Sequence, residues 1–188
     1  MLDKMTEQLF DWQVRAGIQR EADRELYQYA YRLLVHKASG LLLILGLSIA
    51  AGIVCETIVF IAAFMPLRQY AGGCHLKSAG SCLLFSLFVV MMGGYGVHGM
   101  ASLTEDTWFN IVWYLAVLAI FFLAPVGCRN KTLDSIERKI YRYRTRLILL
   151  IECAICIVTG LMHWEMLYFA VQISHFVLAC SLIVGKRQ

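Results

Sequence analysis

The sequence predicts an all-α protein, a polytopic membrane helix bundle. Of its 188 residues, 60% are apolar and only 16% are charged, and the mean hydropathy is +0.65. A soluble domain has about 45–50% apolar and about 25% charged residues. The apolar residues also form long uninterrupted runs. Together these observations exclude a soluble globular domain, a disordered chain and a small secreted scaffold.

Five apolar runs define the expected membrane helices. They cover residues 40–67, 81–101, 108–127, 147–162 and 166–185. Because about 20 helical residues span the hydrocarbon core of a bilayer, each of the last four runs predicts one crossing. The first run has 28 residues, which is enough for one tilted helix or for two short ones.

The positions of the basic residues predict how these helices are oriented. Lys and Arg gather in 1–38, around residue 70, in 128–146 and at the C-terminus, whereas the links 102–107 and 163–165 contain none. Basic loops stay in the cytoplasm, so the basic segments are expected inside and the two links outside. Both termini are then cytoplasmic, and the number of crossings is even.

An even number requires the run 40–67 to be a hairpin of two short helices. Ala51-Gly52, followed by Glu56, offers a place for the chain to reverse. The total is then about six membrane helices. The alternative is one tilted helix over 40–67, with five crossings and an external N-terminus.

The polar N-terminal segment 1–38 is expected to form amphipathic surface helices in the cytoplasm. Leu2, Met5, Leu9 and Trp12 recur at helical spacing, which fits a helix lying on the inner membrane surface. Packing of this face against the protein's own cytoplasmic segments is the alternative. Residues 39–188 are then the transmembrane domain, with cytoplasmic loops at 68–82 and 128–146.

Most cysteines and histidines are expected to be structural. Cys153 and Cys156 have the C-x-x-C spacing, but they lie in an apolar helix without basic neighbours, so core packing is predicted for them, as for Cys55 and Cys180. The isolated histidines His98, His163 and His175 are expected to be hydrogen-bonded structural residues. No cofactor and no metal ion is expected.

The segment 68–82 differs because it is polar and glycine-rich and holds both His75 and Cys82. A cysteine nucleophile needs a base within about 2.6–3.2 Å. On one straight helix these residues would lie about 10 Å apart along the axis. A dyad therefore requires His75 on a loop that folds back over a helix beginning near Ser78 to Ser81, with Cys82 in its first turn.

The glycines and serines of this segment suit such a fold. Gly72, Gly73 and Gly80 permit the turn, and Ser78 or Ser81 is suited to cap the helix. Two other interpretations remain open. One is a cytoplasmic loop with an incidental histidine. The other is a metal site of Cys74, His75 and Cys82, for which a fourth ligand is missing.

The string Arg68-x-x-Ala-Gly-Gly-x-His75, followed by Cys82, resembles the accessory gene regulator B (AgrB) family of bacterial membrane peptidases. Ala124-Pro125-Val126, which leads into a basic stretch, matches as well. The resemblance implies a cysteine endopeptidase of the bacterial cell membrane, with its active site at the cytoplasmic face. The enzyme would cut the C-terminal part of a small AgrD-like precursor and promote cyclisation to a thiolactone or lactone quorum-sensing signal.

Site residues follow from the same resemblance. Cys82 matches the nucleophile and His75 its general base, while Arg68 and Gly73 match positions that the family holds around this pair. Loop and oxyanion support is expected from Arg68, Gly72, Gly73 and Ser78. Two departures from the family pattern are Cys74, beside the base, and Thr132, where a proline is frequent.

The basic stretch 128–146 has a net charge of +5, from seven basic residues minus Asp134 and Glu137. Its ordinary role is to orient the chain and to contact anionic lipid headgroups. A sharper hypothesis is that it docks the acidic tail of the precursor. The candidate residues are Lys131, Arg138, Lys139, Arg142 and Arg144.

The expected partners are therefore the precursor and membrane lipids, with a homodimer as a further expectation from the resemblance and no nucleic acid. The competing functional class is a small transporter or exporter subunit without peptidase activity. Glu56 and Glu152 with His98 and His175 are its candidate intramembrane groups.

Overall fold

The computed structural model describes residues 2–73, 79–100, 107–127 and 134–186. The described residues form seven α-helices and one short 3₁₀-helix, which confirms the predicted all-α class. The chain divides into two compact units, Met1–Leu47 and Ser48–Gln188.

In the first unit, α1 (Leu2–Arg15) folds back on the start of α2 (Arg24–Ala51). Gly17, with φ +68°, lies in the reversal between them, before the 3₁₀-helix Glu21–Asp23. The fully buried Phe10 packs on Tyr27 at 5.9 Å between ring centroids, and the Arg24 guanidinium lies 4.9 Å from the Phe10 ring centroid. Trp12 remains 61% exposed, so one face of α1 packs on the chain itself and Trp12 lies outside that contact.

The helix α2 corrects one expectation. It runs unbroken for 28 residues through the predicted boundary between 38 and 39, so the first helix of the predicted hairpin is not short. Ser39 and Gly40 do not interrupt it, because the Ser39 hydroxyl donates to the carbonyl of His36 at 3.0 Å within the helix.

The predicted break at Ala51-Gly52 is confirmed. Gly52 has φ +73°, its N–H donates to the Ile49 carbonyl at 3.2 Å, and the Ile53 N–H donates to the Ser48 carbonyl at 3.0 Å. This pair of bonds is a Schellman motif, which ends a helix at a left-handed residue. The next helix, α3, begins two residues later and covers Val54–Ala71.

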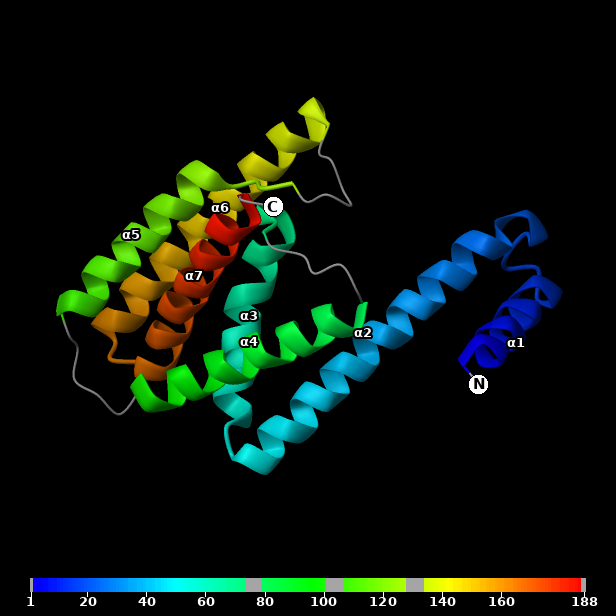
Figure 1. The fold of residues 1–188 in the computed structure, drawn as a ribbon, viewed down its shortest axis with the longest axis horizontal. Helices are drawn as coiled ribbons and strands as arrows, with labels where there is room; N and C mark the ends of the chain where they lie inside the picture. Colours follow the sequence, from blue (N-terminus) through cyan, green and yellow to red (C-terminus); the bar gives the residue numbers. More distant parts are fainter. Residues whose placement is uncertain (1, 74–78, 101–106, 128–133, 187–188) are drawn as a thin grey trace. The chain divides into compact units, whose positions relative to one another are not determined.

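The second unit is built around its last helix, α7 (Glu165–Lys186). This helix lies between α5 (Thr107–Leu123) and α3 and also packs against α4 (Ala79–Met100) and α6 (Ser135–Leu161) (Figure 1). Its side chains Leu178 and Leu182 are fully buried beside Leu67, Ile120 and Leu149 from α3, α5 and α6. A displacement of α7 would therefore disturb its contacts with α3, α4, α5 and α6.

The structure also corrects the expectation that the whole basic segment 128–146 is a loop. It is helical from Ser135, so α6 begins 12 residues before the apolar run at 147. Asp134 caps the helix by accepting a hydrogen bond from the Ser135 N–H at 2.6 Å, and Glu137 reaches back to the Asp134 N–H at 3.4 Å. This capping box, together with the good helix propensity of Lys and Arg, explains why this part is not a loop.

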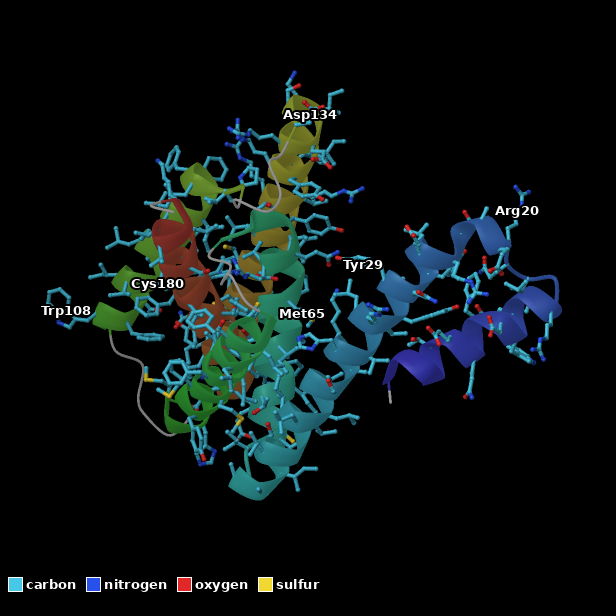
Figure 2. The ribbon with its side chains drawn as sticks, turned by 45° about the vertical axis from the view of Figure 1, so that its right-hand side comes forward. Arg20, Tyr29, Met65, Trp108, Asp134 and Cys180 are labelled. Carbon is cyan, nitrogen blue, oxygen red and sulfur yellow. The ribbon has the colours of Figure 1, made fainter. Side chains whose placement is uncertain are left out.

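Three helical segments in the described part of the chain are long and apolar enough to cross a membrane: Glu21–Ala51, Gly80–Met100 and Glu165–Lys186. Trp108–Leu123 is a shorter apolar helix. Large apolar side chains cover the outside of the second unit, among them Met65 at 61% and Trp108 at 74% exposure (Figure 2). Such a surface fits lipid, and the chain is a membrane protein.

Candidate functional site

Arg68 fixes the point at which α3 ends. Its guanidinium Nη1 donates a hydrogen bond to the carbonyl oxygen of Gly72, and the Gly72 N–H donates to the Arg68 carbonyl at 3.2 Å. Gly72 and Gly73 have φ of +75° and +125°, which residues other than glycine rarely adopt. The helix therefore stops at Ala71, just before the segment that contains His75 in the sequence.

A side chain at Gly73 would require its neighbours to move. A Cβ atom there would collide with the Arg68 guanidinium and lie 2.7 Å from the Ser181 hydroxyl oxygen of α7. The structure thus brings Arg68 and Gly73, both predicted site residues, together with Ser181, which the sequence analysis missed. No motif connects positions 73 and 181, so only the packing of α7 on α3 identifies Ser181.

Residues 71–73, where the chain leaves α3, are called the loop root below. The loop root also pairs with the segment that follows α5. The Val126 N–H donates to the Ala71 carbonyl at 2.9 Å, and Gly72 and Val126 form an isolated parallel β-bridge. A Cβ atom on Gly72 would collide with the Val126 carbonyl oxygen. Two parts of the sequence that carry the family resemblance, far apart in the chain, are therefore in direct contact.

Cys82 lies in the first turn of α4, which begins at Ala79 as the sequence analysis expected. Its thiol is free and partly exposed. The first turn of a helix presents backbone N–H groups without intrahelical partners. Cys82 therefore lies beside donors suited to a developing negative charge.

Three predicted site residues fall outside the described residues. His75 and Ser78 lie in 74–78, and Lys131 lies in 128–133. Cys74, the further ligand of the alternative metal site, lies in the same segment as His75. In the described part of the chain, no three His, Cys, Asp or Glu side chains are grouped so that they could hold a metal ion.

The remaining basic candidates, Arg138, Lys139, Arg142 and Arg144, are exposed on the first turns of α6. Arg144 reaches α3, where its guanidinium carbon lies 5.3 Å from the centroid of the Tyr70 ring. Tyr70 also packs edge-on against Tyr141 of α6 at 5.9 Å between centroids. Because Tyr70 lies between Arg68 and Gly72 in the chain, the basic start of α6 adjoins the loop root.

A second polar arrangement lies deep in the bundle. The indole N–H of Trp113 donates to Nδ1 of His175 at 3.0 Å, and Nε2 of His175 lies 2.8 Å from a carboxylate oxygen of Glu152. All three side chains are buried. The expectation of a hydrogen-bonded structural histidine is confirmed for His175. Its partners were not predicted, although an ionisable residue on each of two apolar helices was a signal that the two could pair.

The other histidine and cysteine expectations have mixed outcomes. His98 is also hydrogen-bonded, as expected, since its Nδ1 lies 2.8 Å from a Glu56 carboxylate oxygen. Core packing is confirmed for Cys156, which is 1% exposed, and Cys153 packs against the same apolar cluster. It is wrong for Cys55 and Cys180, which are exposed on the outside of α3 and α7. An apolar run predicts which residues lie within the bilayer. It does not predict which face of the helix points to lipid, and this is why Cys55 and Cys180 were assigned to the core.

Comparison with protein families identifies the chain. The family model described as AgrB, accessory gene regulator B, matches residues 3–184. The chain belongs to the AgrB family. Comparisons with curated proteins and with solved structures gave no match. Membership in the AgrB family implies a peptidase that processes an AgrD precursor in quorum sensing. In this AgrB protein the match extends from α1 to α7 and thus includes the clamped loop root, Cys82 and the basic start of α6.

Proposed function

We propose that this AgrB protein is a membrane cysteine endopeptidase in which Cys82 is the nucleophile and His75 the general base. The observation that carries the proposal is the geometry on either side of the segment 74–78. Arg68, Val126 and Ser181 hold the chain before it, at Gly72 and Gly73, and α4 begins directly after it, with Cys82 in its first turn. A histidine held between two fixed points is suited to reach back to a thiol on the adjoining helix.

In the proposed reaction the Cys82 thiolate attacks a peptide carbonyl in the C-terminal part of the precursor. His75 takes the thiol proton and gives it to the departing amine, so that an acyl-enzyme thioester forms and the acidic tail leaves. A cysteine thiol or serine hydroxyl of the bound precursor then attacks the thioester, closes a thiolactone or lactone, and releases Cys82. Exclusion of water by the surrounding bilayer and protein protects the thioester from hydrolysis.

Backbone N–H groups are the proposed oxyanion donors. The Gly72 N–H already donates to the Arg68 carbonyl, which favours Gly73 and the first turn of α4 as the donors instead. The Arg68 guanidinium is engaged with the Gly72 carbonyl. We therefore assign Arg68 to loop support, together with Gly72, Gly73 and Ser78.

The acidic tail of the precursor is proposed to dock on the basic start of α6. Arg138, Lys139, Arg142 and Arg144 are exposed there, beside the loop root, and Lys131 precedes them in the chain. Opposite charge both steers the precursor and directs its C-terminal part toward Cys82. The same residues also contact anionic lipid headgroups.

The proposed topology has residues 1–38 and both termini in the cytoplasm, with about six membrane helices and the active site at the cytoplasmic face. Its support is that Arg68, the basic start of α6 and the C-terminal part of α7 meet at one end of the second unit. Basic residues gather on the cytoplasmic side of membrane proteins. A homodimer is part of the same proposal and rests on family membership alone.

An exporter subunit without peptidase activity is the competing class, because buried ionisable groups such as Glu152 and His175 also mark transport paths. A thiol-reactive activity probe separates the two. The peptidase should have one hyperreactive cysteine, whose labelling is lost in Cys82→Ala, persists in Cys74→Ala and is blocked by an AgrD-type precursor. Uniform, slow labelling of all cysteines in the wild-type protein would contradict the proposal.

A further inference from the structure

The buried chain of Trp113, His175 and Glu152 joins three helices of the bundle, α5, α7 and α6. His175 has no exposed surface, and Trp113 and Glu152 are each 6% exposed. Trp113 packs in addition against the buried apolar residues Cys156 and Val171. A carboxyl group in such surroundings is costly unless it is hydrogen-bonded. Here its partner is His175, at 2.8 Å.

The direction of each hydrogen bond in this chain follows from the donors. An indole N–H donates and never accepts, so Nδ1 of His175 accepts from Trp113 and carries no hydrogen. The ring hydrogen is therefore on Nε2, which donates to Glu152. The chain runs one way, from Trp113 through His175 to Glu152. Removing any member leaves a buried polar atom of its neighbour without a partner.

The helix that carries His175 also reaches the proposed active site. Ser181 follows His175 by six residues on α7, which is about 9 Å along the helix axis. Its hydroxyl oxygen lies 2.7 Å from the place that a Cβ atom of Gly73 would occupy. Gly73 in turn precedes His75 by two residues in the sequence. The axial position and rotation of α7 thus determine the space left for the loop root.

We infer that Trp113, His175 and Glu152 are positioning residues for the peptidase. Their hydrogen-bonded chain fixes the register of α7 against α5 and α6, so that Ser181 supports Gly73 and, through it, the segment that carries His75. This inference rests on the proposed function, in which His75 is the base. It assigns a role in the reaction to three residues in the bundle interior that do not touch the precursor.

The first test compares Glu152→Leu with Glu152→Gln in the full-length protein, assayed with an AgrD-type precursor. Leucine removes the acceptor of the His175 N–H, whereas the glutamine amide oxygen replaces it. We expect kcat for Glu152→Leu to fall about tenfold or more with KM within about twofold, because bound precursor would meet a misplaced base. Glu152→Gln should restore kcat to within about threefold of wild type. Glu165→Leu, at the exposed start of α7, is the matched control and should leave both values unchanged.

The outcomes decide between positioning and other roles. Wild-type kcat in Glu152→Leu would overturn the inference. Equal inactivity of the leucine and glutamine variants would also overturn it, since the charge and not the hydrogen-bonded chain would then be required. If Glu152→Leu does not accumulate in the membrane, Trp113→Phe takes its place in the test, because it removes a single donor from the same hydrogen-bonded chain. It should lower kcat likewise, and unchanged kcat there would count against the inference.

The second test follows α7 without using activity. Ser181→Cys, in a chain whose native cysteines are replaced by serine, is alkylated with a maleimide, with and without Glu152→Leu. The leucine variant should change the alkylation rate, whereas Glu152→Gln and Glu165→Leu should not. The same rate in all four proteins would refute the change in register. The alkylation rate does not depend on Cys82. If Cys82→Ala still cleaved the precursor, the proposed function would be refuted, but the alkylation test of the position of α7 would remain valid.

Discussion

The guanidinium of Arg68 donates a hydrogen bond to the carbonyl oxygen of Gly72, four residues later, where α3 ends. The side chain therefore closes the last turn of its own helix. The same guanidinium borders the space above Gly73, together with Ser181. Arg68 thus determines the path of the chain into the segment that contains His75, which is a structural role distinct from binding an acidic substrate.

This relationship predicts that Arg68→Lys is nearly as harmful as Arg68→Ala. Lysine keeps the charge but lacks the planar group that donates to Gly72 beside Gly73. A hydrogen bond from a charged group contributes about 1.5–3 kcal/mol, so kcat should fall about tenfold or more in both variants. The measurement is steady-state cleavage of an AgrD-type precursor, with membrane insertion checked in parallel. Near-normal cleavage by the lysine variant would indicate that only the charge matters.

Gly73→Ala should abolish most activity without preventing insertion into the membrane. The added Cβ atom would collide with the Arg68 guanidinium and crowd Ser181, and φ at Gly73 is +125°. The strain is relieved only if the guanidinium leaves the Gly72 carbonyl or the backbone at Gly73 moves, and either change disturbs the path to His75. We therefore expect kcat to fall by about 100-fold, equivalent to about 3 kcal/mol.

Gly99→Ala is the matched control for that substitution. A Cβ atom at Gly99 meets nothing within 4 Å, and the residue lies in α4, where alanine is a better helix former than glycine. Its cleavage rate should equal that of the wild type. If the alanine variants at 73 and 99 behaved alike, close packing at Gly73 would have no catalytic consequence.

Reversal of two charges on α6, Arg142→Glu with Arg144→Glu, should weaken precursor binding. Both side chains are exposed on the basic start of the helix, and attraction between exposed charges is screened by salt. We expect KM to rise about tenfold at low ionic strength and the difference from wild type to shrink as salt is added. The double variant Arg15→Glu with Arg20→Glu changes the net charge equally and controls for bulk charge. If the difference in KM between the Arg142→Glu, Arg144→Glu variant and wild type did not change with salt concentration, docking by charge would be contradicted.

The sequence predicted those parts of the fold that follow from local chemistry. The apolar runs located α4, α5 and α7, and the Ala51-Gly52 pair located the break before α3. The length of α2 and the start of α6 were missed for related reasons. Continuity across Ser39-Gly40 needs no special signal, and the Asp134–Glu137 capping box was hidden in a stretch judged by its charge.

The candidate site divides in the same way. Arg68, Gly73 and Cys82 were predicted as candidates because a compact motif carries them. The contact of Ser181 with Gly73, the bridge from Val126 to Gly72 and the pairing of Glu152 with His175 depend on which segments pack together, and one sequence does not determine that. Long-range contacts of this kind arise from the packing of α7 against its four neighbours.

The central claim is that Cys82 is the nucleophile, and cleavage of an AgrD-type precursor by three proteins tests it most directly. Wild type and Cys74→Ala should cleave at similar rates and form a covalent acyl adduct that hydroxylamine releases. Cys82→Ala should form neither product nor adduct while inserting normally in the membrane. Cleavage by Cys82→Ala at a rate near that of wild type would contradict the account.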